Sequence, residues 1–340
     1  MNIYDIAELS GVSIATVSRV INNSSSVSAA TKDKVMKVLS SSNYTPNVFA
    51  RGLGIGSMES VGIICPDISD AFMAEAISLL EQELKSHGYA CIVGCSGHRL
   101  EEKINLTNFF ISKRVDALIL VGSTYAEKDE SDNDYLRKVA EQTPVFLVNA
   151  LVKGANIFCA TCNDFQATYN AAERLIENGR QRIVFLYDSK SHSAMQKMHG
   201  YKKALTKKGL PVRDELMIQT EDDIQYTKDL LLNNSSLEFD AVLAIQDNIA
   251  IGALKYAHAL GKSIPDDICV IGYNNSRFAI SCEPELTSID NHLEQLCKSA
   301  IDVMLCVLGG EKNVAAIFQI EPDLVERSST NFKANKVDKK

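Results

Sequence analysis

From residue 60 onward, short apolar runs alternate with amphipathic stretches, and the whole alternation occurs twice. The first series of runs is SVGIICP, YACIVG, VDALILVG and PVFLVN, and the second is RIVFLY, LMIQT, FDAVLAI and DICVIGY. Apolar runs separated by helical patterns are typical of buried parallel strands joined by helices. The pattern predicts an α/β fold with two Rossmann-like parallel-sheet subdomains and a cleft at the carboxyl ends of their strands. A helix from Ile289 to Leu308 and the strand NVAAIFQI are expected to cross back between the halves.

The N-terminal residues carry the pattern of a small all-α unit. Asn2 and Asp5 suit the start of one helix, and Ser13 suits the cap of a second helix that begins at Ile14. Gly11 can adopt the left-handed conformation that a tight corner between two helices needs. Ser28 is the expected cap of a third helix. The residues with helical spacing that predict one shared core are Ile6, Val12, Val17, Val20, Ile21, Val35, Val38 and Leu39. These features predict a helix-turn-helix head.

Outside that core, the second helix presents small, hydroxyl and basic side chains, which suit a DNA major groove. Ile14 and Ala15 are expected to meet thymine methyl groups, and Arg19 to bind guanine O6 and N7. The expected contacts to the DNA backbone come from Tyr4, Thr16, Ser18 and Asn22, beside the cap residue Ser13. The alternative is a generic three-helix cap on a larger domain, with a solvated Arg19.

The charge distribution favours DNA binding over that alternative. Residues 1–56 contain five basic and three acidic side chains, a net charge of +2, so the remaining residues carry −10 of the total of −8. A basic head on an acidic body is typical of a DNA-binding protein with a separate effector domain.

Three segments, YDIAELSGVSIATVSRVIN, VSAATKDKV and NYTPNVFARGL, resemble the LacI/GalR family of transcription regulators. The resemblance implies a periplasmic sugar-binding fold behind the head and a hinge that becomes helical on operator DNA. Asn47 is then the cap of the hinge helix, residues 48–53 form it, and Leu53 is wedged into the minor groove. Tyr44 and Arg51 belong to the same DNA-binding segment. Gly52 lies inside the expected hinge helix, where glycine makes helix formation less favourable than alanine by up to about 1 kcal/mol. The alternative interpretation of residues 45–57 is a plain flexible linker.

The resemblance and the strand pattern together give an expected domain organisation. Residues 1–44 form the helix-turn-helix domain, 45–58 the hinge or linker, 59–330 the effector-binding and dimerisation domain, and 331–340 a flexible tail. Within the effector domain, one subdomain spans about 59–159 plus 290–318. The other spans about 160–289 plus 319–330.

Polar or aromatic residues after the predicted strands are the candidates for binding an effector, because sugar hydroxyls bind polar side chains and sugar faces stack on aromatic rings. These candidates are Asp70, Phe72, Ser123, Asn163, Ser193, Lys197, Gln246, Asp247 and Asn274. The resemblance implies a repressor of carbohydrate-metabolism genes that is controlled by a sugar or sugar phosphate.

Three positions depart from the sugar-responsive members of the family. Lys197 stands where many have arginine, Asn274 where aspartate is usual, and Asn163-Asp164 where Asp-Asn is usual. Lysine lacks the planar fork of arginine, and asparagine lacks the charge of aspartate. Lys197 also resembles the catabolite control protein A branch, in which a phosphorylated carrier protein is the corepressor. That branch places the partner surface outside the cleft, on the half nearest the head.

No catalytic or cofactor-binding pattern stands out. Gly52, Gly54 and Gly56 precede the first strand instead of joining a strand to a helix, and the six histidines are scattered. Cys159 and Cys162 are three residues apart in a predicted strand, so they face opposite sides and do not share a metal. The nine cysteines are expected to be reduced. We therefore expect no enzyme, no cofactor and no metal site. A sugar-binding transport protein would explain the α/β body but not the head.

Two expectations concern assembly and location. One head reads about half an operator, so a homodimer on a pseudo-palindromic operator is expected, with the helix faces of residues 71–85 and 97–113 and their counterparts in the second half as its interface. The lysine-rich C-terminal segment is too short for a coiled coil. No signal peptide or apolar run of about 20 residues is present, so the expected location is cytoplasmic, associated with the nucleoid.

Overall fold

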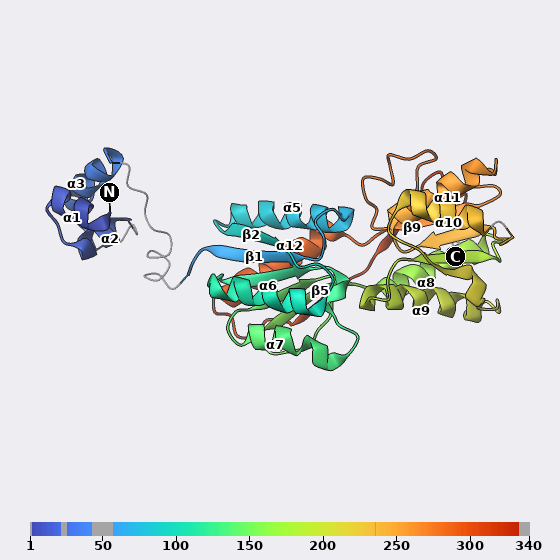
Figure 1. The fold of residues 1–340 in the computed structure, drawn as a ribbon, viewed down its shortest axis with the longest axis horizontal. Helices are drawn as coiled ribbons and strands as arrows, with labels where there is room; N and C mark the ends of the chain where they lie inside the picture. The colour runs from blue at the N-terminus through green and yellow to red at the C-terminus, as the bar shows by residue number, and fades with distance from the viewer. Residues whose placement is uncertain (1, 22–25, 43–56, 235, 333–340) are drawn as a thin grey trace, which may run out of the picture. The chain divides into compact units, whose positions relative to one another are not determined.

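The structure is a computed structural model that describes residues 2–21, 26–42, 57–234 and 236–332. The chain divides into two units: a head of residues 1–60 with 114–116, and a body of residues 61–113 with 117–340 (Figure 1).

The head contains three helices: α1 (Ile3–Ser10), α2 (Ile14–Ile21) and α3 (Ala29–Ser40). The Asn2 side chain accepts from the backbone N–H groups of Tyr4 and Asp5, and the Asp5 carboxylate accepts from Asn2 N at 2.7 Å, which completes a capping box. Gly11 ends α1 with φ at 62°, in the left-handed region. The predicted helix-turn-helix is therefore confirmed.

The predicted core of the head is also present. The fully buried positions are Ile6, Ala7, Val17, Val20 and Val35, and the partly buried ones around them are Ile3, Val12, Ile21, Val27, Val38 and Leu39. The core takes side chains from all three helices, so the orientation of α2 depends on α1 and α3.

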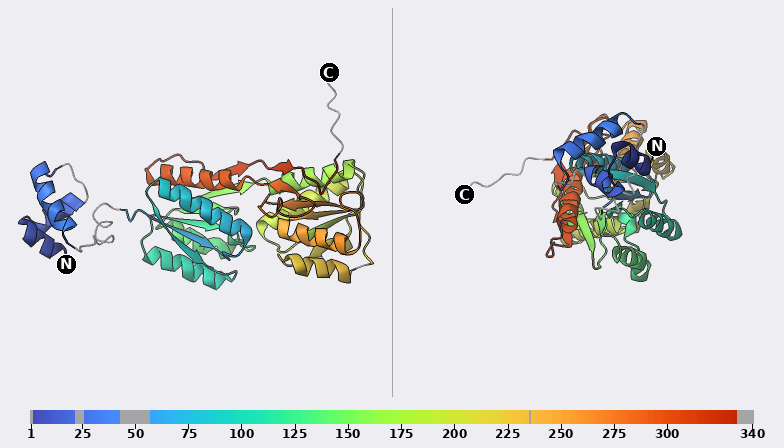
Figure 2. Two further views of the ribbon diagram at one scale, coloured as in Figure 1. Left: turned by 90° about the horizontal axis from the view of Figure 1, so that it is seen from above. Right: turned by 90° about the vertical axis from the view of Figure 1, so that its left-hand side faces the viewer.

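The body contains two parallel-sheet halves, as predicted. The first half has strands β1 (Ser60–Cys65), β2 (Ala90–Cys95), β3 (Ala117–Val121), β4 (Val145–Val148), β5 (Ile157–Cys162) and β11 (Ile317–Ile320). Its helices are α5 (Ala71–Ser86), α6 (Leu100–Ser112), α7 (Asp134–Ala140) and α12 (Leu293–Leu308), with short 3₁₀ turns η1 (Ser123–Tyr125) and η2 (Glu130–Asn133). Helices α5 and α12 lie side by side on one face of this sheet, and α6 and α7 cover the other (Figures 1 and 2).

The second half repeats this arrangement. Its strands are β6 (Ile183–Tyr187), β7 (Met217–Gln219), β8 (Ala241–Ala244), β9 (Cys269–Tyr273), β10 (Thr287–Asp290) and β12 (Asp323–Val325). Its helices are α8 (Asp164–Glu177), α9 (His192–Lys207), α10 (Ile224–Asn233) and α11 (Asp247–Ala259), with the 3₁₀ turn η3 (Asp214–Leu216). Helices α8 and α9 pack together below the sheet in the view of Figure 1, and α10 and α11 pack together above it.

The two sheets have equivalent strand orders, β11-β5-β4-β3-β1-β2 and β12-β10-β9-β8-β6-β7. The edge strand β12 is antiparallel to β10, whereas β11 is parallel to β5. In such an order the direction in which successive strands are added to the sheet reverses between the parallel neighbours β1 and β3, and between β6 and β8. Ligands of open α/β sheets bind at the carboxyl ends of the strands beside that point. The topology therefore places a binding site after β1, β3, β6 and β8.

Four sequence-based boundaries are wrong. The helix predicted from Ile289 begins at Leu293, because residues 287–290 pair with β9 as strand β10. The subdomain boundaries at 159 and 318 fall inside β5 and β11, which pair with each other as far as Cys162 and Ile320. The predicted tail includes Phe332, but this residue packs against the second core, with the centre of its ring 5.1 Å from the Arg174 guanidinium carbon.

The nine cysteines are free thiols, as expected. Cys159 donates to the carbonyl oxygen of Val152, while the Cys162 sulfur lies 3.9 Å from the Tyr273 hydroxyl, so the two sulfurs have different surroundings. Within the described residues there is no group of three or more potential metal ligands, and no helix has the length and apolarity needed to span a membrane.

Candidate DNA-binding face and ligand cleft

The predicted DNA-binding side chains of α2 lie on the outside of the head. Ile14, Ala15 and Arg19 are exposed, Thr16 and Ser18 are half-buried, and Tyr4 of α1 is exposed. This exposure has a local cause, because Val17 and Val20 occupy the head core and turn the intervening positions outward. The predicted contacts Asn22, Tyr44, Asn47, Arg51 and Leu53 lie outside the described residues, as does most of the predicted hinge.

Ser13 has a structural role at the start of α2. Its hydroxyl oxygen accepts from Thr16 N at 3.2 Å and lies 2.9 Å from the Thr16 hydroxyl. The cap leaves the first backbone N–H groups of α2 at the exposed end of the helix, where such groups bind phosphate. The start of α2 therefore combines backbone donors with the exposed side chains of Ile14 and Ala15, and Arg19 is exposed in the last turn of the same helix.

In the body, a cavity of about 170 Å³ lies where the carboxyl ends of both sheets meet. Seven of the nine predicted effector-binding residues line it: Asp70, Phe72, Ser123, Ser193, Lys197, Gln246 and Asn274. Asp70 follows β1 and Ser123 follows β3, while Gln246 follows β8, as the reversal of strand order requires.

The other two predicted residues lie elsewhere. Asn163 lines a neighbouring cavity of about 230 Å³, caps α8, and donates to the Glu321 carboxylate at 2.9 Å. Asp247 lines neither cavity, because its buried carboxylate accepts from Ser276 N, Ser276 Oγ and Ser288 Oγ at 2.6–2.8 Å. Asp247 thus fixes the loop that follows β9.

The sequence reasoning missed other polar residues that line the first cavity: His98, Thr124, Asn149, Asp188, Ser189 and Ser191. Asn149 and Asp188 are the first polar residues after β4 and β6. The rule that selected Asp70 and Gln246 would have found both of them. His98 and Ser191 lie further along their loops, and no local signal distinguishes them from other loop residues.

Lys197 is the buried cation of this cleft. Its ammonium group lies 3.5 Å from the centre of the Tyr273 ring and donates to the carbonyl oxygen of Ile245 at 3.3 Å. Burial lowers the pKa of Lys197, and the neighbouring carboxylate of Asp164 acts in the opposite direction. Tyr273 in turn donates to Asp164 at 2.5 Å. The lysine is therefore fixed by aromatic, carbonyl and carboxylate groups of the protein.

Three carboxylates from both halves approach one another at the cleft. Burial, and then Asp188, raise the pKa of Asp70 on the first half. Burial raises the pKa of Asp222, on the second half, to about 7, with further contributions from Asp70 and Asp188. Asp188 also accepts from the Gln246 amide at 2.6 Å. Both halves therefore contribute carboxyl groups to this edge of the cleft, and their mutual repulsion favours the protonated form.

Direct contacts link the cleft to the segments that cross between the halves. The Ser123 hydroxyl donates to the Ser191 hydroxyl at 2.9 Å, across the cleft. The Asn291 amide donates to Asn274 Oδ1 at 3.0 Å, and Asn291 stands in the segment between β10 and α12. A ligand that touches Asn274 therefore acts one hydrogen bond away from a crossing segment.

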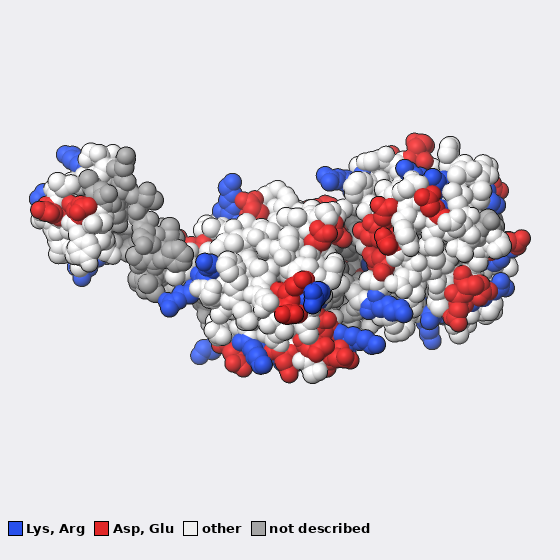
Figure 3. Space-filling model, viewed as in Figure 1, with Lys and Arg blue, Asp and Glu red and all other residues white. Residues whose placement is uncertain are grey.

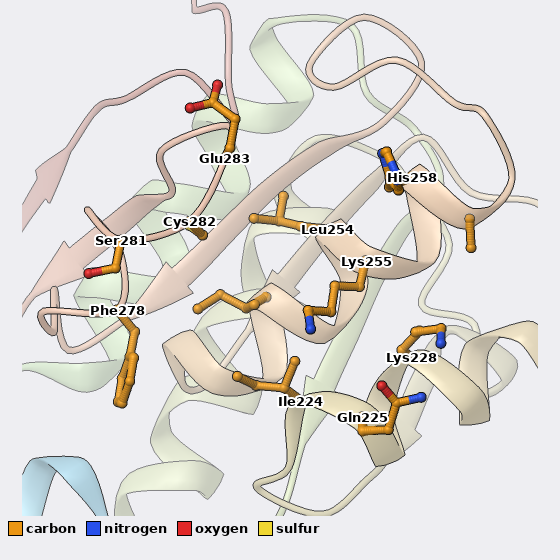
Figure 4. Close-up of a pocket in the computed structure, with 12 residues that line it drawn as sticks. Ile224, Gln225, Lys228, Leu254, Lys255, His258, Phe278, Ser281, Cys282 and Glu283 are labelled. Carbon is orange, nitrogen blue, oxygen red and sulfur yellow. The ribbon is translucent and has the colours of Figure 1, made fainter.

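A second concavity, the outer groove, lies on the second half (Figure 4). It has a volume of about 650 Å³ and lies between α10, α11 and residues 278–283. Its apolar side chains include Ile224, Leu254 and Phe278, and its charged ones are Lys228, Lys255 and Glu283. On the face of the body drawn in Figure 3, acidic and basic side chains are intermixed among the described residues, which is unlike the continuous basic surface that binds DNA.

Comparisons with known proteins agree with this geometry. Residues 2–47 match the model of bacterial regulatory proteins of the lacI family, and residues 172–330 match that of a periplasmic binding protein-like domain. An HTH-type transcriptional regulator of Lachnoclostridium phytofermentans is 46% identical over 98% of this chain and 100% of its own length. Catabolite control protein A of Priestia megaterium is 31% identical over 97% of this chain and 99% of its own length.

Solved structures share the fold. The lac repressor dimer bound to operator and the anti-inducer ONPF aligns with a TM-score of 0.85 at 23% identity, over 97% of this chain and 98% of that one. The complex of the transcriptional regulator CelR with cellobiose aligns with a TM-score of 0.70 at 23% identity, over 97% of this chain and 100% of that one.

Proposed function

The chain belongs to the LacI family of bacterial regulatory proteins, and on that premise we propose that it represses carbohydrate-metabolism genes under the control of a saccharide bound in the cleft. Membership makes it a DNA-binding transcriptional regulator and not an enzyme. The observation that carries the proposal is the convergence of Asp70, Ser123, Lys197, Gln246 and Asn274 on one cavity between two sheets.

The chemistry of the cavity suits a saccharide. Its hydroxyl and amide side chains both donate and accept hydrogen bonds, as ring hydroxyls require, and Phe72 supplies an apolar surface. CelR, which shares the fold, was solved with cellobiose. We assign the candidate effector contacts to the residues that line this cavity.

The proposed switch is a change in the angle between the halves. A saccharide that binds both Ser123 of one half and Asn274 of the other favours one angle, because its contacts differ between open and closed states. The hydrogen bond from Asn291 to Asn274 transmits that preference to a crossing segment. We propose that the angle between the two halves determines whether the two heads of a dimer fit one operator. The proposed location of the protein is the cytoplasm.

We propose that the active form is a homodimer in which the outer groove is part of the interface. The lac repressor, which shares the fold, was solved as a dimer on its operator. A twofold interface buries the same patch on both subunits, so a groove with Lys228 and Lys255 beside Glu283 complements a second copy of itself. The other part of the proposed interface is the outer face of α5 and α6.

A phosphorylated carrier protein as corepressor is a second candidate, raised by relatives named catabolite control protein A. The outward side of α12, on the first half, does not favour it. The exposed charged residues there include two carboxylates, Glu294 and Asp302, and one cation, Lys298. The carboxylates would repel the phosphoryl group of the carrier protein. A saccharide is therefore the effector that the structure supports best.

The test is a gel-shift assay of the full chain against the region upstream of its own operon, with and without a panel of saccharides. We expect a specific complex whose affinity changes at least tenfold with one saccharide. The same saccharide should have no effect on a chain with Asn274→Ala. A specific complex that no saccharide changes, but that a phosphorylated carrier protein strengthens, would replace the first candidate by the second.

A further inference from the structure

The charged side chains around the cleft also bear on the charge of the ligand that it binds. Resting on the proposed function, we propose that the cleft selects saccharides by charge: it accepts those that are uncharged or carry an ammonium group, and it rejects phosphorylated ones. This selection would distinguish free saccharides from sugar phosphates, and it follows from the arrangement of the charged side chains around the cavity.

The carboxylates at the cleft form no direct ion pairs with basic side chains of the described residues. Asp70 Oδ1 accepts from Met73 N at 2.9 Å, and Asp188 Oδ2 accepts from the Gln246 amide at 2.6 Å. Asp222 Oδ1 is buried with no hydrogen-bond partner. Among the described residues, none of the three carboxylates forms a direct ion pair, and the cation that interacts with one of them at longer range is Lys197, with Asp188.

The position of these groups makes the charge relevant to a ligand. Asp70 and Asp188 both line the cavity, one from each half, and Asp222 is close enough to both for their charges to raise its pKa. Like charges that face one another oppose closure of the cleft. A ligand that donates hydroxyl or ammonium hydrogens relieves this repulsion, and a phosphate dianion increases it.

Lys197 is the cation nearest to these acidic groups, and it is already engaged by other groups of the protein. Its ammonium lies over the Tyr273 ring and donates to Ile245, and the carboxylates of Asp164 and Asp188 stabilise its charge. To bind a phosphate, Lys197 would have to leave these partners. Among the described residues that line the cavity, the other basic side chain is His98.

The experiment uses isothermal titration calorimetry on the full chain, with matched pairs of free and 6-phosphorylated glucose, galactose and cellobiose, and with glucosamine. For each saccharide that binds, we expect the phosphorylated form to bind at least tenfold more weakly. Asp70→Asn and Asp188→Asn should each reduce that ratio at least threefold, because they remove negative charge with little change in shape.

Asp67→Asn is the matched control, since Asp67 lies in the same loop as Asp70 but is exposed and does not line the cavity. It should leave the ratio unchanged. Equal or tighter binding of a phosphorylated form would overturn the charge selection and leave the effector function intact. No binding of any saccharide by a chain that still shifts its operator would instead overturn the saccharide function, and the charge selection with it.

Discussion

Asp247 and Lys197 are buried charged residues whose polar atoms bind groups of the protein beside the cleft. The Asp247 carboxylate accepts three hydrogen bonds from Ser276 and Ser288, and thereby holds the loop that brings Asn274 to the cavity. An unsatisfied buried donor costs about 1–3 kcal/mol, so loss of this carboxylate affects the loop before it affects binding. Aspartate at position 247 therefore determines the position of the loop that carries Asn274, and through it the shape of the cavity.

On the head, Arg19 is the residue whose substitution best tests DNA reading. Arg19→Ala should weaken specific operator binding by about 1–3 kcal/mol and relax the preference at one base pair, because a bidentate contact to guanine is lost. Selection of binding sites from a random library measures both effects. Lys37→Ala, an exposed basic residue on α3, is the control and should leave the base preference unchanged. An Arg19→Ala selection identical to that of the unaltered chain would refute the assignment.

Asp222 predicts a dependence of stability on pH. Its pKa is raised from 3.8 to about 7, mainly by burial, so the folded state binds a proton more tightly than the unfolded state between those values. Stability from this group is therefore present at low pH and lost as pH rises from about 4 to about 7. Asp222→Asn should remove this loss and raise the free energy of unfolding at pH 7.5 by roughly 1–4 kcal/mol.

Urea denaturation at pH 5 and pH 7.5 measures the effect. Asp229→Asn is the control, because Asp229 is exposed on α10, and it should not change the dependence of stability on pH. Asp223→Asn is unsuitable, because Asp223 caps that helix. An Asp222→Asn variant with the same stability difference between the two pH values as the unaltered chain would contradict the prediction.

At the scale of elements, α8 and α9 pack closely against each other. Gly200 of α9 lies against the backbone of α8, so that an added Cβ would come 2.3 Å from the Phe165 carbonyl oxygen and 2.9 Å from Tyr169 N. Backbone atoms cannot move aside as a side chain end can. The same helix carries Ser193 and Lys197 to the cavity, so its distance from α8 also sets the cleft.

Gly200→Ala should therefore destabilise the body by about 1–3 kcal/mol through overpacking, although alanine alone would favour a helix by up to about 1 kcal/mol. Thermal and urea unfolding of the full chain measure this change. His199→Ala, at the exposed neighbouring position, should change stability by less than about 0.5 kcal/mol. A Gly200→Ala chain more stable than its parent would show that α9 can shift without cost.

At the scale of the whole chain, two equivalent sheets share three crossing segments. The chain passes between the sheets after β5, after β10 and after β11. Three connections restrict the halves to a change of angle and prevent free separation. In the proposed mechanism, a ligand in the cleft controls this change of angle, and the proposed dimer passes it to two heads.

The proposed dimer gives the prediction at this scale. Ile224→Asp should weaken self-association at least tenfold, because it places a carboxylate among the apolar side chains of the outer groove. Sedimentation velocity over a concentration series measures the dissociation constant. Tyr226→Asp on the same helix is the matched control, since Tyr226 is exposed and outside the groove. A monomer–dimer equilibrium unchanged by Ile224→Asp would exclude the groove from the interface.

The sequence by itself determined the features that depend on neighbouring residues. The caps at Asn2 and Ser13, the corner at Gly11 and the alternation of strands with helices follow from local hydrogen bonding and from hydrophobic periodicity. The strand ends also located most of the cavity, because the carboxyl ends of parallel strands lie at one edge of a sheet whatever its loops contain.

Only the tertiary structure decided which polar residue at a strand end faces the cavity. Gln246 and Asp247 are adjacent in sequence, yet Gln246 lines the cavity and Asp247 is bound by Ser276 and Ser288. It also decided that residues 287–290 extend a sheet and that Asp70 meets the charges of Asp188 and Asp222. These outcomes depend on contacts between residues far apart in the chain, which periodicity and capping do not encode.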